Sequence, residues 1–130
     1  MKTQIKLWLD DVRDPVKFGK IGWFWAKTYD EAVKAFEEYD VIEASLDHDL
    51  TFDQTVGFED GEKTGHSLVC WMEERNIFPA NGVTVHSANP WGAQRMVAGL
   101  KAICRRNNIS EQAVRRRAED FVDVHGWFTK

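Results

Sequence analysis

Two apolar stretches of this 130-residue chain stop abruptly at acidic residues. The first is Leu7-Trp8-Leu9-Asp10-Asp11, and the second is Ser45-Leu46-Asp47-His48-Asp49-Leu50. A strand in a protein core cannot bury adjacent carboxylates, so each predicted strand must end where its aspartates begin. If the two strands are parallel neighbours, their carboxylates converge at one edge of the sheet. Such a cluster repels itself unless it holds a cation, and hard oxygen ligands favour Mg²⁺, with Mn²⁺ or Ca²⁺ as alternatives.

Two histidines lie next to predicted strand ends. His48 stands between Asp47 and Asp49, and His86 precedes Ser87 at the end of a later β-branched stretch. An imidazole beside the cluster is able to protonate a leaving alkoxide, while a cation lowers the pKa of a bound water to make the nucleophile. Asp47, His48 and His86 are therefore the candidate catalytic residues. The structural alternatives are a plain salt bridge for His48 and, by strand alternation, a His86 side chain that points away from the face of Ser87.

The positions of apolar residues, caps and breakers predict strands that alternate with helices. Strands are expected at 5–9, 23–26, 41–46 and 82–87, and helices at 28–39, 64–76, 89–106 and from Ser110 onward. Between the first two strands, Pro15 and the glycines after it leave room only for a loop. The acidic segment 51–63 is interpreted as a second loop and a candidate lid over the site.

This alternation favours an α/β fold with a parallel sheet and right-handed crossovers. We expect a three-layer, flavodoxin-like sandwich with strand order 2-1-3-4, a degenerate fifth strand and a helical C-terminal extension. Residues 1–130 then form a single domain, with its core at about 5–107 and a C-terminal helix and tail at 108–130. In this order, ligands bind between the carboxyl ends of the first and third strands, which end in Asp10-Asp11 and Asp47.

Donors for an anion follow the fourth predicted strand. Ser87 ends that strand, and Asn89 caps the next helix, whose N-terminus attracts phosphate oxygens. Arg13 across the pocket and Arg95 further along the helix are the charged partners expected for the same phosphate. Each arginine also fits an ordinary ion pair. Trp91, at the exposed start of the helix, is a candidate for stacking on a nucleobase.

Composition and charge narrow the classes of function. With 43% hydrophobic residues, six Trp and eight Phe, the chain is able to bury a sizeable core. A formal net charge of −4 lacks the basic excess typical of proteins that bind duplex DNA or an anionic membrane. The two cysteines, Cys70 and Cys104, have no zinc-site spacing and are interpreted as core thiols. No stretch reads as a signal segment or reaches membrane-spanning length, so we expect a cytoplasmic protein.

Four motifs in this chain resemble those of a known family. The aspartates after the first and third strands and Ser87-Ala88 after the fourth resemble the acidic pair, phosphoacceptor aspartate and Ser/Thr-Ala of bacterial response-regulator receiver domains. The fuller strings more closely resemble the cyclic-phosphate processing receiver domain family, from Lys6 to about Asn107. These strings are Leu7-Trp8-Leu9-Asp10-Asp11-Val12-Arg13-Asp14-Pro15, Ser45-Leu46-Asp47-His48-Asp49-Leu50, Thr64-Gly65 and His86-Ser87-Ala88-Asn89-Pro90.

The resemblance implies a receiver-like fold and action on cyclic phosphates in nucleotide or RNA metabolism. It also implies that Asp10, Asp11 and Asp47 hold a divalent metal, with the backbone carbonyl of Asp49 as a further ligand. The candidate catalytic residues and the candidate phosphate-binding residues named above complete the expected site.

The chain departs from the pattern at three points. No predicted strand after Asn107 ends in lysine, whereas a receiver's fifth strand does. The first crossover helix has shrunk to a loop. Ser67 stands where an acidic residue is expected in the cyclic-phosphate processing receiver domain family. The first two departures weaken the interpretation of the site as a phosphorylation switch.

The first functional interpretation is a metal-dependent phosphoesterase, a hydrolase acting on a small nucleotide or an RNA terminus that carries a cyclic phosphate. One alternative is a receiver-like signalling or partner-binding module in which Asp47 accepts a phosphoryl group. Another is a nucleotide-sequestering protein without turnover. The missing lysine and the added histidines favour the enzyme over the signalling module. Nothing in the sequence separates hydrolysis from sequestration or sets the oligomeric state.

Overall fold

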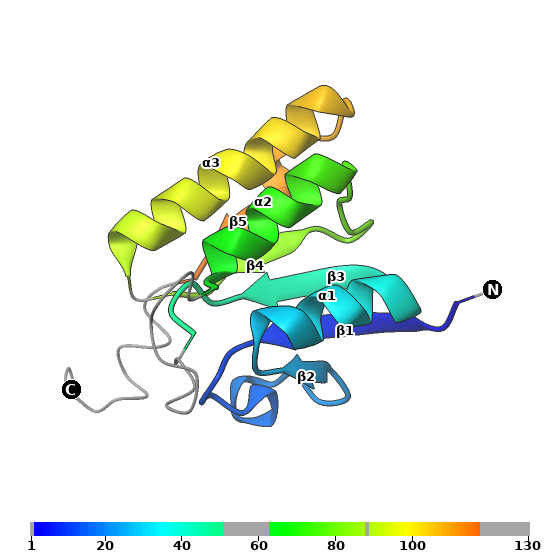
Figure 1. The fold of residues 1–130 in the computed structure, drawn as a ribbon, viewed down its shortest axis with the longest axis vertical. Helices are drawn as coiled ribbons and strands as arrows, with labels where there is room; N and C mark the ends of the chain where they lie inside the picture. The colour runs from blue at the N-terminus through cyan, green and yellow to red at the C-terminus, as the bar shows by residue number, and fades with distance from the viewer. Residues whose placement is uncertain (1, 51–62, 88, 118–130) are drawn as a thin grey trace.

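The chain folds around a five-stranded parallel sheet with the order β2-β1-β3-β4-β5. The computed structural model describes residues 2–50, 63–87 and 89–117 (Figure 1). The strands are β1 (Gln4–Leu9), β2 (Phe24–Ala26), β3 (Asp40–Leu46), β4 (Val83–Val85) and β5 (Val114–Arg116). The predicted order 2-1-3-4 is confirmed, and the fifth strand is short, as expected of a degenerate one.

Within the residues that the structure describes, three α-helices connect the strands, and the first residue of each predicted range is the N-cap of the helix. They are α1 (Tyr29–Glu38), α2 (Gly65–Arg75) and α3 (Pro90–Arg106). The N-cap side chains of Thr28, Thr64 and Asn89 each accept a backbone N–H from the first turn. Ser67 completes a capping box with Thr64, which gives this residue a structural role in the helix. None of the helices in the described ranges is long and apolar enough to cross a membrane.

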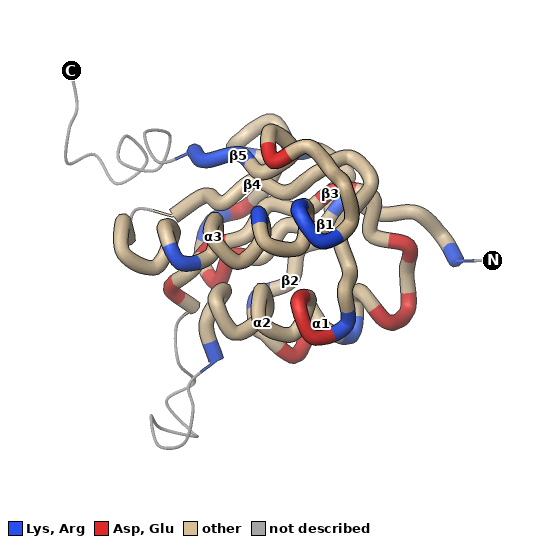
Figure 2. The backbone as a smooth tube through the Cα atoms, turned by 90° about the horizontal axis from the view of Figure 1, so that it is seen from above, with Lys and Arg blue, Asp and Glu red and all other residues tan. Residues whose placement is uncertain are grey.

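All three α-helices cover the same face of the sheet (Figure 2). The steps from β2 to β3, from β3 to β4 and from β4 to β5 run in one direction across the sheet, so right-handed crossovers place their helices together. The step from β1 to β2 runs the other way and carries only the short 3-10 helix η1 (Pro15–Phe18). The prediction of a loop in place of the first crossover helix is therefore confirmed.

The two faces of the sheet bury different residues. Strand and helix side chains on the helix-covered face form the apolar core, which includes Leu7, Leu9, Leu46, Val85, Leu68, Met72, Met96 and Leu100. On the η1 side, Trp8 stacks on Phe18 and meets Trp23 edge-on. Trp8 also stacks on His86, with ring centroids 4.0 Å apart. The second face thus has an aromatic core that contains a buried polar ring.

The C-terminal region differs from the sequence prediction. Ser110 caps a helix, as expected, but this is the short 3-10 helix η2 (Glu111–Ala113). The chain then enters β5, which pairs with β4 through Val83↔Val114 and Val85↔Arg116. The predicted continuation of the helix over residues 114–116 is wrong, because strand pairing outweighs the helical spacing of the apolar residues there, and the sheet extends past the expected core boundary at 107. Segment 51–62 of the candidate lid, Ala88 and the extension from 118 onward lie outside the described residues.

Candidate metal centre

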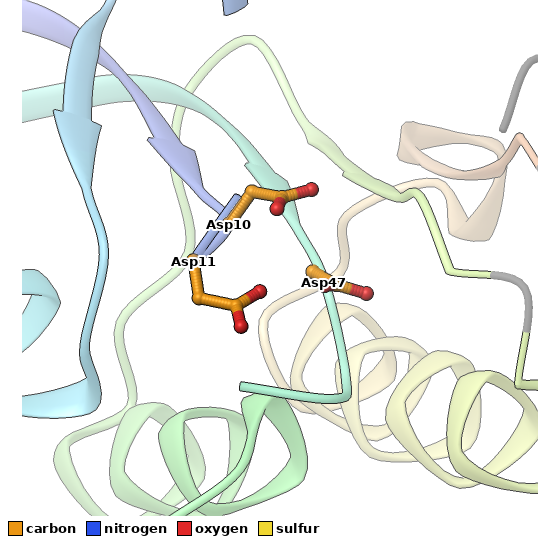
Figure 3. Close-up of side chains that lie close together, drawn as sticks. All are labelled: Asp10, Asp11 and Asp47. Atoms are coloured by element: carbon orange, nitrogen blue, oxygen red, sulfur yellow. The ribbon is translucent and has the colours of Figure 1, made fainter. Parts of the chain in front are cut away.

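Asp10, Asp11 and Asp47 lie together at the carboxyl edge of the sheet (Figure 3). One carboxylate oxygen of each lies within 4.8 Å of the others. The pairing of β1 with β3 causes this, since Leu9 is opposite Leu46 and the Asp47 N–H donates to the Leu9 carbonyl at 2.9 Å. The convergence expected from the two strand ends is therefore present in the structure.

Asp10 is buried and fixed by several donors. Its Oδ1 accepts the backbone N–H groups of Val12 and Arg13 at 2.9 and 2.8 Å. Its Oδ2 lies 3.1 Å from His86 Nε2 and 3.2 Å from Arg13 Nη1. Burial acts to raise the pKa of Asp10, but the hydrogen bonds from His86, Arg13 and Val12 outweigh it and hold the pKa below its ordinary value. Asp10 is thus a firmly held carboxylate.

Asp47 lies in a very different environment, although it too is almost inaccessible, with 3% of its surface exposed. Burial first, and then repulsion from Asp10, raise the pKa of Asp47 to about 8, and the charge of Arg13 only partly offsets them. The Arg13 Nη1 lies 3.6 Å from Asp47 Oδ2. The carboxyl of Asp47 therefore favours a proton or a further cation.

The start of α2 holds the backbone around Asp47 in place. The N–H of Gly65 donates to the His48 carbonyl at 2.9 Å. A Cβ on Gly65 would overlap the carbonyl oxygen of Asp47, so only glycine permits this approach. The Thr64-Gly65 motif thus has a steric reason, which is to bring a capped helix against the end of β3.

His48 and Asp49 meet the start of α3. The Nδ1 of His48 lies 2.7 Å from Asp49 Oδ1, and the same oxygen accepts a hydrogen bond from Asn89 Nδ2 at 3.0 Å. The His48 ring packs on Gly92, where a Cβ would overlap it. The side chain of Asp49 is 65% exposed and, within the described part of the chain, lies outside the three-carboxylate cluster. The role of its backbone carbonyl as a ligand stays a prediction.

His86 lies beneath Asp10 and is only 1% exposed. Its Nδ1 lies 2.6 Å from Ser45 Oγ, while Nε2 faces Asp10. Burial lowers the pKa of His86 and so favours the neutral ring. The neutral ring then donates Nε2–H to Asp10 and accepts the Ser45 hydroxyl at Nδ1. Sequence reasoning missed Ser45, although a serine inside a buried strand is a signal for a buried polar partner.

The four predicted phosphate-binding residues have different positions. Arg13 lies inside the acidic cluster. Ser87 is buried, and its Oγ accepts the N–H of Asn89 at 3.1 Å. The side chain of Asn89 accepts the Gly92 N–H at 3.0 Å as the cap of α3. Arg95 is exposed on α3, and its charge is one of the causes, after burial, that lower the pKa of His66.

A further cation stands at the end of β5. The N–H of Arg117 donates to the Val85 carbonyl at 3.0 Å, which sets this residue beside the end of β4. Its charge is among those that lower the pKa of His86. The helix expected from Ser110 onward gave no indication of this position, because residues 114–116 form a strand instead. An arginine therefore follows the strand that ends in lysine in the parent receivers.

Comparison with known families gives a match for most of this chain. The family model described as Cyclic-phosphate processing Receiver domain matches residues 5–102, from the first residues of β1 to the last turns of α3. The match includes the three aspartates of the cluster, Arg13 and the start of α3. A search of the curated proteins found no match.

Proposed function

The chain belongs to the cyclic-phosphate processing receiver domain family, and from this premise we propose that it is a metal-dependent phosphoesterase. Its proposed substrate is a small nucleotide or an RNA terminus that carries a cyclic phosphate. The observation that carries the proposal is the convergence of Asp10, Asp11 and Asp47 at the carboxyl edge of the sheet. A buried anionic cluster of this kind is suited to a cation and, through the cation, to a phosphoryl group.

The donor set fits a hard divalent cation. All three side chains offer carboxylate oxygens, and burial and repulsion from Asp10, which raise the pKa of Asp47 to about 8, favour a cation beside this carboxyl. Asp10, Asp11 and Asp47 would hold Mg²⁺, with Mn²⁺ or Ca²⁺ as alternatives. When bound there, the ion supplies Lewis acidity toward phosphoryl oxygens and lowers the pKa of a water in contact with it.

The protein's own groups then bind and orient the substrate. The N-terminus of α3, capped by Asn89, offers a positive dipole to phosphate oxygens. Arg13, whose Nη1 lies 3.6 Å from Asp47 Oδ2, brings positive charge to the cluster. His48, whose side chain is partly accessible and is held by Asp49, is the proposed proton donor to the leaving oxygen. His86 acts in this proposal as a positioning residue, since it is buried against Asp10.

The environment of Asp47 argues against the signalling alternative. A phosphoacceptor must present its carboxylate to a phosphodonor, whereas Asp47 is buried and Arg13 Nη1 lies 3.6 Å from its Oδ2. Sequestration of a nucleotide uses the same groups and differs only in the absence of turnover. The test must therefore separate turnover, retention and covalent labelling.

The experiment incubates the protein with Mg²⁺ or Mn²⁺ and a panel of 2′,3′-cyclic, 3′,5′-cyclic and cyclic oligonucleotides. We expect ring opening of at least one class by the wild type and by Asp40→Asn, a control at the other end of β3. We expect none from Asp47→Asn. Tight retention without product would replace the enzyme with a sequestering protein. Labelling of Asp47 by acetyl phosphate would replace it with a signalling module.

A further inference from the structure

Arg13 lies inside the acidic cluster, and its guanidinium bridges two buried carboxylates. Nη1 lies 3.2 Å from Asp10 Oδ2 and 3.6 Å from Asp47 Oδ2. The side chain is only 12% exposed. The cluster thus already contains one permanent positive charge, since a guanidinium is not deprotonated in proteins.

The backbone of Arg13 is fixed independently of its guanidinium. Its N–H donates to Asp10 Oδ1 at 2.8 Å, and its carbonyl accepts the Trp8 indole N–H at 2.8 Å. Pro15 follows two residues later and begins η1. The residue is therefore anchored beside the cluster, while the long side chain supplies the charge.

A divalent cation at the cluster would share two carboxylates with Arg13. Nη1 of Arg13 lies 3.2 Å from Asp10 Oδ2 and 3.6 Å from Asp47 Oδ2, and both residues are among the three that would hold the ion. Two cations at such short range from the same oxygens repel each other strongly. The guanidinium also competes with the ion for those lone pairs.

From this geometry we infer that Arg13 is a built-in counter-cation that competes with the divalent metal for Asp10 and Asp47. Its presence limits the cluster to one divalent ion and weakens the affinity for that ion. Binding of the ion moves the guanidinium off Asp47 and makes its donors available to the phosphate of the substrate. The inference rests on the metal site of the proposed function, but it does not require turnover.

The test is a titration of Mn²⁺ into protein stripped of metal with a chelator, followed by calorimetry and by the electron paramagnetic resonance of free Mn²⁺. We expect Arg13→Ala to bind Mn²⁺ at least about tenfold more tightly than the wild type. Arg13→Lys keeps the charge without the planar fork and should fall between them. If Arg13→Ala does not fold by circular dichroism, Arg13→Gln, which keeps the length and the donors without the charge, decides in its place.

Two control variants separate competition at the carboxylates from general electrostatics. Arg117→Ala removes a cation at the end of β5, and Arg105→Ala removes an exposed one that pairs with Glu111. We expect less than about a twofold change in Mn²⁺ affinity from either. Equal gains from Arg13→Ala and Arg117→Ala, or unchanged or weaker binding by Arg13→Ala, would overturn the inference. Mn²⁺ binding without turnover would overturn the proposed function alone, and a wild type that binds no Mn²⁺ would overturn both.

Discussion

Asp10 and Asp47 follow neighbouring strands, yet their carboxylates lie in opposite electrostatic surroundings. Asp10 accepts hydrogen bonds from two backbone N–H groups and from His86 and Arg13, and its pKa is held low. Asp47 is also buried, but the pKa of its carboxyl is raised to about 8. Asp10 is therefore a carboxylate that the fold already stabilises, whereas the charged form of Asp47 still favours a further cation.

The largest expected effect comes from removing each carboxylate in turn. Asp10→Asn places an amide where several donors converge, so we expect the free energy of unfolding to fall by about 2–4 kcal/mol. Asp47→Asn removes a carboxyl whose charged form is disfavoured in the folded protein. We therefore expect the free energy of unfolding to rise by roughly 1–3 kcal/mol at pH 7. Turnover should fall by at least about a hundredfold in Asp47→Asn.

Urea denaturation of both variants without metal measures this contrast, with Asp40→Asn as the matched control. Equal losses of stability in the two site variants would mean that the two carboxylates have the same environment. In that case the distinction between a stabilised carboxylate and a cation site fails.

The contrast also predicts a dependence on pH. The pKa of Asp47 is about 8 in the folded protein and 3.8 in an ordinary environment, so between these values the folded state holds a proton that the unfolded state has lost. Stability in a chelator should therefore fall as the pH rises through this window. Metal affinity should rise toward pH 8 and then level off, because the ion must displace the proton. Calorimetry at roughly pH 6, 7 and 8, in buffers of different ionisation enthalpy, measures both the affinity for the metal and the number of protons released.

A smaller effect should follow from changing the support beneath Asp10. His86→Phe keeps a ring that stacks on Trp8 but removes the bonds to Asp10 and Ser45. We expect a loss of about 1–3 kcal/mol in stability and a rise in the pKa of Asp10. The carboxyl carbon signal of Asp10 in a nuclear magnetic resonance titration measures that pKa. A loss confined to kcat, with stability and that titration unchanged, would instead assign His86 to proton transfer.

The smallest expected effect lies at the rim of the site. Trp91 is 77% exposed at the start of α3, next to the Gly92 that packs on His48. Trp91→Ala should change stability by less than about 0.5 kcal/mol. If the ring stacks on a base, KM should rise severalfold for cyclic nucleotides and stay unchanged for a cyclic phosphate ester that lacks a base. Equal changes for both ligands would contradict the stacking role.

The sequence was informative where local chemistry decides structure. The acidic strand ends, the caps at Thr28, Thr64 and Asn89 and the breaker at Pro15 each act within a few residues, so the sheet order and the convergence of the aspartates could be predicted. The acidic strand ends also indicated the family resemblance, and the family match over residues 5–102 confirms it.

The features that were missed depend on strand register. Ser45 and His86 meet only because β3 lies beside β4, and Arg117 lies beside the end of β4 only because residues 114–116 form a strand. The apolar spacing beyond Ser110 is equally compatible with a helix, and it predicted one. Likewise, the pairing of Arg13 with both Asp10 and Asp47 follows from the β1 and β3 contact and has no signature in the sequence itself.

The most direct test of the account is the stoichiometry of Mn²⁺ binding at pH 8 in the wild type, Asp47→Asn and Asp40→Asn. We predict one ion per chain in the wild type and in Asp40→Asn, and at least about a tenfold weaker affinity in Asp47→Asn. A wild type that binds no Mn²⁺, or an Asp47→Asn variant that binds it as tightly as the wild type, would contradict a metal centre built on these three aspartates.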